Sequence, residues 1–392
     1  MTVIKQESIF TGKYIPSEIV HRDNEIKEIS NRMNRPLSGS PAKNTLIQGM
    51  GGTGKTLIVR YVAEQLSKQT TDVQVYYFRL RDYPTEYKAI KKISQELTGV
   101  DYQGHSSQYI YERVFEHIKH KKNKYTVFIF DEVDAIEKGY AIFLDMFLRY
   151  YENFNMWDKE VSVIYISNNT KFPQDLPVGT KSSWSCIDKL TFERYKADQL
   201  RDILVERAEK GLYEGTYNES VIPLCAAMSA QEHGDARRSI ELLGKAAQMA
   251  QSEGAKIIKE SHVRKAWDQL EYDRPVQQIN ALPIQGKAIT LAIIWDFKKG
   301  LREKYKDGTQ PTTASVYAEY KEICKHLDIL ILTQRRVRDI LLELSAMELI
   351  NTYIEYKGRY GNSLHVALSI PHEVVEKVLA SDPVFSSYLK PL

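Results

Sequence analysis

The chain has 392 residues, of which 43% are hydrophobic and 27% charged, with 54 Lys and Arg against 51 Asp and Glu. This composition predicts two or three folded domains and excludes a wholly disordered protein. Three widely separated cysteines exclude a disulfide scaffold and favour a reducing, intracellular location, and no apolar run reaches the ~20 residues that cross a bilayer.

Strands and helices alternate through the first two hundred residues. The apolar patterns predict strands at 44–50, 73–80, 125–134 and 161–169, and helices at 56–67, 86–98, 108–120 and 138–152. Because strands separated by helices pair in parallel, we expect an α/β domain with a parallel sheet covered on both faces.

The strand pattern stops after about Thr191, and the rest of the chain predicts two further domains. Amphipathic helices are predicted at 197–211, 217–230, 235–254 and 260–273, and residues 273–283, with a proline near each end, are the best candidate for a linker. Helices at 285–299, 313–326 and 333–347 and a hairpin at 350–370 then match an α+β winged helix. The predicted domains are therefore 1–190, 191–275 and 276–392.

A glycine-rich segment, residues 49–56, fits the phosphate-binding pattern G-x-x-x-x-G-K-S/T. Glycines let main-chain N–H groups approach a phosphate chain, and the helix that follows directs its positive end at the same charge. Lys55 is expected to reach the β- and γ-phosphates, and Thr56 to hold Mg²⁺. The segment predicts a site for ATP or ADP with Mg²⁺; the alternative is a glycine-rich turn that binds nothing.

Two carboxylates follow the buried strand near residue 130, at the end where α/β sheets bind ligands. Asp131 suits the Mg²⁺ shell, and Glu132 suits the base that polarises an attacking water. The alternative is an ordinary acidic helix cap.

Four further polar residues are candidates for the nucleotide site. Asn168, at the end of the next strand, could orient the attacking water, although Asn is also common in turns. Arg237 could reach the γ-phosphate, Tyr195 could pack on the nucleotide, and Arg207 could approach its phosphates. By themselves these three would be assigned to helix surfaces.

The order of these motifs, with Gly234-Asp235-Ala236-Arg237 last, resembles the AAA+ ATPases. The segments Tyr14-Ile15-Pro16 and Ile19-Val20-His21-Arg22 resemble a signature of the archaeal origin-recognition and helicase-loading initiators, which are relatives of the eukaryotic origin recognition complex. Residues 192–200 resemble the same family's F-x-P-Y-x-x-x-Q-L motif, with Arg194 in place of the proline.

The resemblance implies a nucleotide lodged between an AAA+ sheet domain and a helical lid. The expected nucleotide contacts are Val20, His21, Arg22, Gly49, Gly51, Gly52, Thr53, Gly54, Lys55, Thr56, Leu57, Tyr195 and Arg207. Thr56 and Asp131 would hold Mg²⁺, Glu132 would be the base, and Asn168 and Arg237 the first and second sensors. The family usually has an arginine that acts on a neighbour's ATP, but residues 176–183 contain none, and Lys181 is a poor substitute.

The last predicted domain carries the features expected of a DNA-binding surface. Residues 274–392 hold 16 basic and 13 acidic residues, which accounts for the whole net charge of +3. In helix 333–347 an apolar stripe of Val337, Ile340, Leu341, Leu344 and Met347 is predicted to be buried. The candidate DNA contacts are Thr333, Gln334, Arg335, Arg336, Arg338 and, in the hairpin turn, Lys357, Arg359 and Tyr360. The alternative is a winged helix that binds protein.

These observations together predict an ATP-dependent initiator of DNA replication. The expected partners are double-stranded origin DNA, the replicative helicase and other initiator paralogues, in an archaeal cytoplasm at the nucleoid. Slow Mg²⁺-dependent ATP hydrolysis would be the switch, and a helical insertion at 83–118 would also touch DNA, as the resemblance implies. The alternatives are another AAA+ regulatory ATPase, a repressor-like paralogue, and a binding module that keeps its nucleotide permanently.

Overall fold

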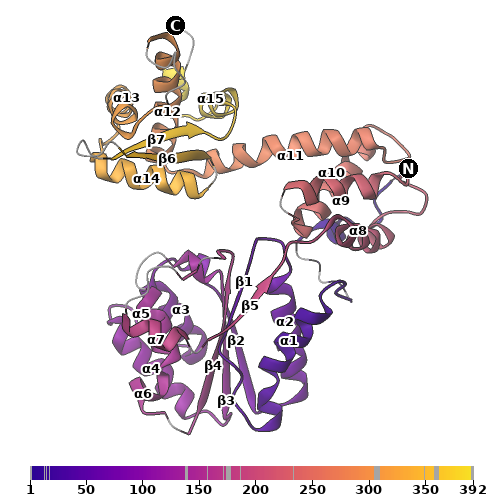
Figure 1. Cartoon of the computed structure of the whole chain (residues 1–392), viewed down its shortest axis with the longest axis vertical. Coiled ribbons are helices and arrows are strands. Elements are labelled where there is room, and N and C mark those ends of the chain that lie inside the picture. The colour runs from indigo at the N-terminus through magenta and orange to yellow at the C-terminus, as the bar shows by residue number, and fades with distance from the viewer. Residues whose placement is uncertain are drawn as a thin grey trace. The chain divides into compact units, whose positions relative to one another are not determined.

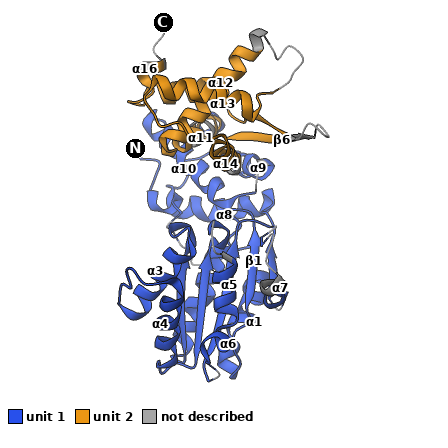
Figure 2. Cartoon of the chain, turned by 90° about the vertical axis from the view of Figure 1, so that its left-hand side faces the viewer, with its two compact units in different colours: residues 1–263 blue, residues 264–392 orange. Residues whose placement is uncertain are grey.

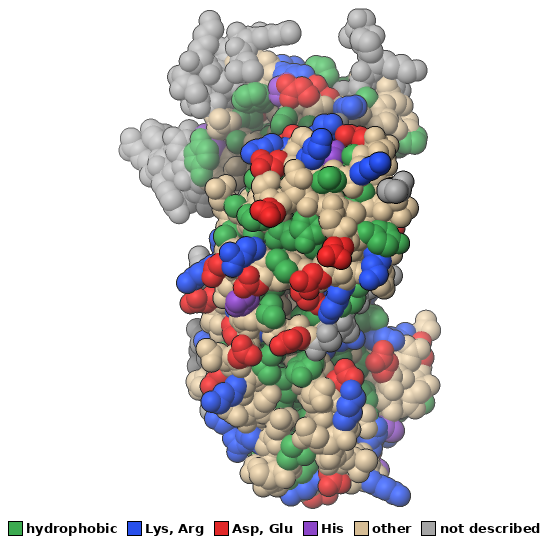
Figure 3. All heavy atoms as spheres, turned by 90° about the vertical axis from the view of Figure 1, so that its right-hand side faces the viewer, with side chains coloured by type: hydrophobic (Ala, Val, Ile, Leu, Met, Phe, Trp, Pro, Cys, Tyr) green, Lys and Arg blue, Asp and Glu red, His purple; other side chains and the backbone are tan. Residues whose placement is uncertain are grey.

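The structure is a computed structural model that describes residues 2–12, 14, 16, 18–136, 140–156, 158–170, 172–173, 178–185, 187–232, 234–303, 310–347, 349–356 and 362–389. The chain forms two compact units, residues 1–263 and 264–392 (Figure 2). On the face drawn in Figure 3, basic and acidic side chains are interspersed, in line with their nearly equal numbers. Within the described residues, no helix has the length and apolar character needed to cross a membrane.

Five parallel strands form the centre of the first unit, which confirms the predicted parallel sheet. They are β1 (Thr45–Gly49), β2 (Val73–Arg79), β3 (Tyr125–Asp131), β4 (Glu160–Ser167) and β5 (Asp188–Phe192), in the order β2-β3-β4-β1-β5. The strand β5 was not predicted from the sequence. This edge strand alternates partly buried and exposed residues and begins with Asp188 and Lys189, so it lacks the continuous apolar run of β3.

Helices cover both faces of this sheet (Figure 1). One face carries α1 (Asp23–Met33) and α2 (Lys55–Gln69), and the other carries α3 (Glu86–Thr98), α4 (Ser107–Lys119), α5 (Tyr140–Leu148), α6 (Tyr150–Phe154) and α7 (Val178–Ser185). Alternate residues of β3 supply the two cores, because successive side chains on a strand point to opposite faces. Phe128 and Phe130 pack with α3, α4 and α5, whereas Val127 and Ile129 pack with α1 and α2.

The strand order decides where the polar residues meet. The strands β3, β4 and β1 are neighbours, and all of them point the same way. Their carboxyl ends therefore bring the acidic pair after β3, Asn168 after β4 and the glycine-rich segment 49–56 at the end of β1, which we call the glycine loop, to one edge of the sheet.

Three helices follow the sheet and form a lid: α8 (Ala197–Gly211), α9 (Val221–Glu232) and α10 (Ala236–Ser252). Residues 3–10, which we call the N-terminal strap, pack on this lid rather than on the sheet. The backbone N–H of Lys5 donates to the carbonyl of Gly211. Phe10 lies so close to Gly211 and Gly244 that a Cβ at either would fall within 2.6 Å of it, so both positions require glycine.

The segment predicted as a linker, residues 273–283, is helical over most of its length, because α11 runs without a break from Glu260 to Ala281. Pro275 lies inside this helix, where a proline removes one hydrogen bond and its ring crowds the carbonyl four residues earlier, and the helix ends two residues before Pro283. The second unit then contains α12 (Ile284–Glu303), α13 (Thr313–His326), α14 (Gln334–Ala346), β6 (Ile350–Tyr356), β7 (Asn362–Leu368), α15 (His372–Ala380) and α16 (Ser386–Leu389). The antiparallel pair β6–β7 and the helices α12, α13 and α14 confirm the predicted winged helix.

Candidate nucleotide-binding site

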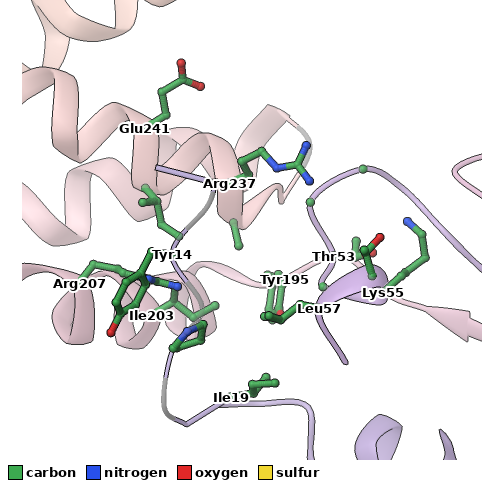
Figure 4. Close-up of a pocket in the computed structure, with 18 of the residues that line it drawn as sticks. Tyr14, Ile19, Thr53, Lys55, Leu57, Tyr195, Ile203, Arg207, Arg237 and Glu241 are labelled. Atoms are coloured by element: carbon green, nitrogen blue, oxygen red, sulfur yellow. The ribbon is translucent and has the colours of Figure 1, made fainter. Parts of the chain in front are cut away.

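A cavity of about 570 Å³ lies in the first unit, between the sheet edge and the lid (Figure 4). Its walls come from the glycine loop, the ends of β3 and β4, the helices α8 and α10, and the chain between Phe10 and Val20. Cavities of this size hold small molecules of the bulk of a nucleotide. The cavity gathers most of the nucleotide contacts expected from the sequence: Val20, Gly51, Gly52, Thr53, Gly54, Lys55, Thr56, Leu57, Tyr195 and Arg207.

The glycine loop needs glycine for reasons that the structure makes explicit. Gly52 and Gly54 have φ angles of +68° and +93°, in the left-handed region that side chains disfavour. A Cβ at Gly52 would lie 1.7 Å from Asp235 Oδ1, because the start of α10 sits directly on the loop. The backbone N–H of Ala236 donates to the carbonyl of Gly52 over 3.2 Å. The lid therefore contacts the loop through main chain.

Lys55 lies buried at the start of α2. Its Nζ donates to the carbonyls of Gly49 (2.8 Å) and Met50 (2.7 Å), and only 4% of the residue is exposed. Burial lowers the pKa of Lys55 to about 8, although the nearby Asp131 carboxylate opposes the shift. An anion in the cavity would stabilise the ammonium form.

The residues expected to hold Mg²⁺ are in contact with each other. Thr56 Oγ1 donates to Asp131 Oδ2 over 2.7 Å, and Tyr77 on β2 donates to the same oxygen, also over 2.7 Å. The backbone N–H of Glu132 donates to Asp131 Oδ1 over 2.9 Å. A hydroxyl and a carboxylate beside a phosphate site are the hard oxygen donors that Mg²⁺ prefers, so these residues fit the ion.

The two residues expected to act on water line the cavity, but their surroundings differ. Glu132 has a φ of +54°, and its Oε2 lies 3.4 Å from Arg81 Nε and 3.7 Å from Arg79 Nε. Asn168 is exposed, and its backbone N–H donates to Asp134 Oδ1 over 3.1 Å. Glu132 is therefore held in ion pairs, whereas the amide side chain of Asn168 is accessible.

The lid supplies two arginines to the cavity wall. Figure 4 shows Arg237 extending from α10 toward the glycine loop. Arg207 on α8 is 6% exposed, and its guanidinium lies 4.3 Å from the centre of the Tyr14 ring. Burial lowers the pKa of Arg207, and its Nη1 has no hydrogen-bond partner in the described part of the chain. A buried donor of this kind fits a ligand rich in acceptor oxygens and nitrogens.

Three expected nucleotide contacts do not line the cavity: Gly49, His21 and Arg22. His21 Nε2 lies 2.8 Å from Asp202 Oδ2 on α8. Arg22 Nη2 donates to the carbonyl of Glu193 over 2.7 Å, and its guanidinium lies 4.0 Å from the centre of the Tyr195 ring. His21 thus joins the segment before α1 to the lid, and Arg22 joins it to the chain that leads from β5 into α8.

Several residues of the site were not predicted from the sequence. Ile203 and Ile240 are apolar lid residues on the cavity wall, and the sequence around them does not distinguish them from ordinary core residues. Tyr14 was noted only as part of a family motif and was not assigned to the site, yet its ring lies against the Arg207 guanidinium on the cavity wall. Tyr77 lies 54 residues before its partner Asp131, so their hydrogen bond becomes apparent only once β2 is known to pair with β3.

The predicted DNA-contacting helix is α14. Thr333 caps it by accepting from the backbone N–H of Arg336, and Gln334, Arg335 and Arg338 are exposed in its first turns. Arg336 is exposed too, but its Nη1 lies 3.1 Å from Glu343 Oε1, whereas Arg335 and Arg338 form no ion pair with any described residue.

The apolar stripe of α14 is buried as predicted at Val337, Ile340, Leu341 and Leu344. The prediction is wrong for Met347, which is 38% exposed because it is the C-cap, beyond the last turn that packs on the core. The candidate contacts Lys357, Arg359 and Tyr360 lie outside the described residues.

Comparisons with known proteins match nearly the whole chain. Three family models match: "AAA ATPase domain" at residues 18–153, "Cdc6 AAA+ ATPase-type lid domain" at 201–268 and "CDC6, C terminal winged helix domain" at 277–378. ORC1-type DNA replication protein 1 of Methanosarcina mazei is 34% identical over 97% of this chain and 91% of its own length. ORC1-type DNA replication protein of Pyrococcus furiosus is 34% identical over 97% and 90%.

Solved structures give the same result. The Aeropyrum pernix ORC1 protein, solved in complex with DNA, is 29% identical, with a TM-score of 0.84 over 98% of this chain and 99% of its own. Cdc6p from Pyrobaculum aerophilum shares the fold at 20% identity, with a TM-score of 0.61 over 99% of this chain and 100% of its own. The chain belongs to the family of ORC1-type DNA replication proteins, AAA+ ATPases with a Cdc6-type lid and a C-terminal winged helix.

Proposed function

We propose that the protein is an ATP-controlled initiator of DNA replication that binds double-stranded origin DNA and helps to load the replicative helicase. The observation that carries the proposal is that one cavity joins the glycine loop of the sheet to Arg207 and Arg237 of the lid. A nucleotide bound there would touch both parts of the first unit. Its terminal phosphate would then change the free energy of the lid position, which is the condition for a ligand-controlled switch.

Each side of the cavity has a distinct task in this proposal. The main-chain N–H groups of the glycine loop and Lys55 hold the phosphates, and Thr56 and Asp131 hold Mg²⁺. When bound, Mg²⁺ neutralises charge on the phosphate oxygens. Arg237 and Asn168 contact the γ-phosphate, so they distinguish ATP from ADP.

Hydrolysis would be slow in this arrangement. The ion pairs of Glu132 Oε2 with Arg79 and Arg81 would compete with the attacking water for this carboxylate. This competition would lower the share of Glu132 side chains that are ready to orient the water. The ATP-bound form would therefore persist and act as the state that engages DNA.

The DNA contacts would come from the first turns of α14. Arg335 and Arg338 are exposed without acidic partners among the described residues, and the cap at Thr333 places the positive end of the helix beside them. The similar Aeropyrum pernix ORC1 protein was solved in complex with DNA, which supports this role. The helices α3 and α4, which span the proposed insertion at 83–118, would add a second contact.

The remaining partners follow from the same proposal. An initiator that loads a helicase must contact that helicase, and other initiator paralogues would bind neighbouring origin sites. The cellular location proposed is the cytoplasm of an archaeon, at the nucleoid.

Footprinting on genomic DNA fragments, with ATP, with ADP and without nucleotide, tests the proposal. We expect protection of specific duplex sites that differs between ATP and ADP, and loss of that difference in Lys55→Ala. The matched control is Lys68→Ala, on the same helix but far along it and ion-paired with Glu64, which should behave as wild type. Protection that is identical in all three nucleotide conditions would refute ATP control. Absence of protected sites would favour a winged helix that binds protein.

A further inference from the structure

Tyr77 is a polar residue of the site that the proposed function leaves without a task. Its hydroxyl donates to Asp131 Oδ2 over 2.7 Å, the same oxygen that accepts from Thr56 Oγ1. Tyr77 lies in β2, where it is paired with Ile129, two positions before the pair of Arg79 with Asp131. It does not line the cavity, so it reaches the site only through the carboxylate.

The hydroxyl of Tyr77 is well suited to be a permanent donor. A tyrosine hydroxyl ordinarily keeps its proton at physiological pH, so it can donate to the Asp131 carboxylate. The ring is also fixed, because the Arg60 guanidinium lies 5.2 Å from its centre and the ring packs against the apolar core under α2. A hydroxyl on a fixed ring can orient a carboxylate more strictly than water can.

The carboxylate of Asp131 accepts hydrogen bonds from three donors among the described residues. The backbone N–H of Glu132 holds Oδ1, and Thr56 and Tyr77 share Oδ2. A threonine hydroxyl can donate its proton and still offer a lone pair to Mg²⁺, so Thr56 can keep its bond to Oδ2 when the ion binds. Asp131 is 4% exposed, so bulk water cannot replace either donor of Oδ2 freely.

We propose that Tyr77 is a positioning residue for the metal, holding Asp131, together with Thr56, in the orientation that binds Mg²⁺. This inference rests on the proposed function, since it concerns the Mg²⁺ that accompanies the nucleotide. Groups that hydrogen-bond to metal-binding residues commonly change metal affinity 10- to 100-fold when they are removed. Tyr77 thereby sets the Mg²⁺ concentration at which the nucleotide site is completed.

The test separates metal binding from nucleotide binding. Tyr77→Phe removes the hydroxyl and keeps the ring beside Arg60. Isothermal titration calorimetry with ADP, in EDTA and over a series of Mg²⁺ concentrations, gives the nucleotide affinity without metal and the Mg²⁺ midpoint. We expect the affinity in EDTA to stay within about twofold of wild type and the Mg²⁺ midpoint to rise roughly 10- to 100-fold.

Tyr76→Phe is the matched control. Tyr76 is the preceding residue of β2, and its ring lies on the opposite face, stacked on Phe128 at 5.5 Å, where its hydroxyl accepts from Lys121. Tyr76→Phe removes a hydroxyl from the same strand as Tyr77→Phe does, and we expect its Mg²⁺ midpoint to match that of wild type.

The other outcomes would refute either the positioning role of Tyr77 or the proposed function itself. An unchanged Mg²⁺ midpoint in Tyr77→Phe, or an equal shift in Tyr76→Phe, would refute the positioning role. Equal loss of affinity with and without Mg²⁺ would also refute it, because it would mean that Tyr77 supports the loop rather than the metal. If wild-type protein bound no ADP in either condition, the proposed function would fail, and this inference with it.

Discussion

Replacing Gly52 by alanine tests the contact between the glycine loop and the lid. An alanine there would carry two costs. Holding a non-glycine residue at a φ of +68° costs about 1–2 kcal/mol. The new Cβ would also lie 1.7 Å from Asp235 Oδ1, which must move away. That oxygen caps α10 by accepting from the backbone N–H of Arg238 over 3.1 Å, and losing such a cap costs about 1 kcal/mol.

The expected loss of unfolding free energy for Gly52→Ala is therefore about 2–3 kcal/mol. Asp235→Ala alone should cost about 1 kcal/mol, because it removes the cap without strain in the loop. The double variant should cost no more than Gly52→Ala, since the cap is removed only once. The two single effects should therefore exceed the double effect by about 1 kcal/mol.

Urea denaturation of the full chain without nucleotide measures these differences, and hydrogen exchange of peptides from α2 and α10 assigns the transition to the first unit. Gly51→Ala is the control, because a Cβ there would meet Asp235 at an ordinary 3.8 Å. We expect it to cost less than about 1 kcal/mol. Strict additivity of Gly52→Ala and Asp235→Ala would show that the loop and the cap are independent, contrary to this reasoning.

Two further predictions concern the ligands. Because burial lowers the pKa of Lys55 to about 8, most Lys55 side chains are neutral at pH 8.5, and the binding of ADP at that pH should take up at least about half a proton. Calorimetry in buffers of different ionisation enthalpy should show this proton uptake in wild type but not in Lys55→Arg. Equal proton uptake in both proteins would contradict the prediction. Arg335 is exposed and forms no ion pair with a described residue, whereas Arg336 is paired with Glu343. Arg335→Ala should therefore lower the slope of log duplex affinity against log salt concentration by about 1 for each phosphate that the protein no longer neutralises, and Arg336→Ala should lower it less. Equal slopes in wild type and Arg335→Ala would place the DNA-binding surface elsewhere.

The sequence predicted the parts of the site that depend on local pattern. The glycine loop and the acidic end of β3 each occupy a few consecutive residues, and parallel strand ends converge by topology, so their meeting could be expected in advance. The expected location of Arg207 and Tyr195 on the cavity wall came from family resemblance, because single residues on a helix carry no such signal.

The interactions that could not be predicted depend on tertiary structure. His21 and Asp202 are 181 residues apart, and the position of one cannot be read from the sequence around the other. The residues around Pro275 show a different limit. Proline usually ends or kinks a helix, yet α11 continues through Pro275 to Ala281, so a local rule does not place the end of this helix.

The N-terminal strap has a consequence for how the molecule is made. Residues 3–10 are synthesised before the lid, and their packing partners Gly211 and Gly244 follow more than two hundred residues later. Until then Phe10 has no site to fill, and one wall of the nucleotide cavity is missing. The cavity is therefore complete only once the lid has been synthesised, so any ligand that needs both walls should be retained only from that point on.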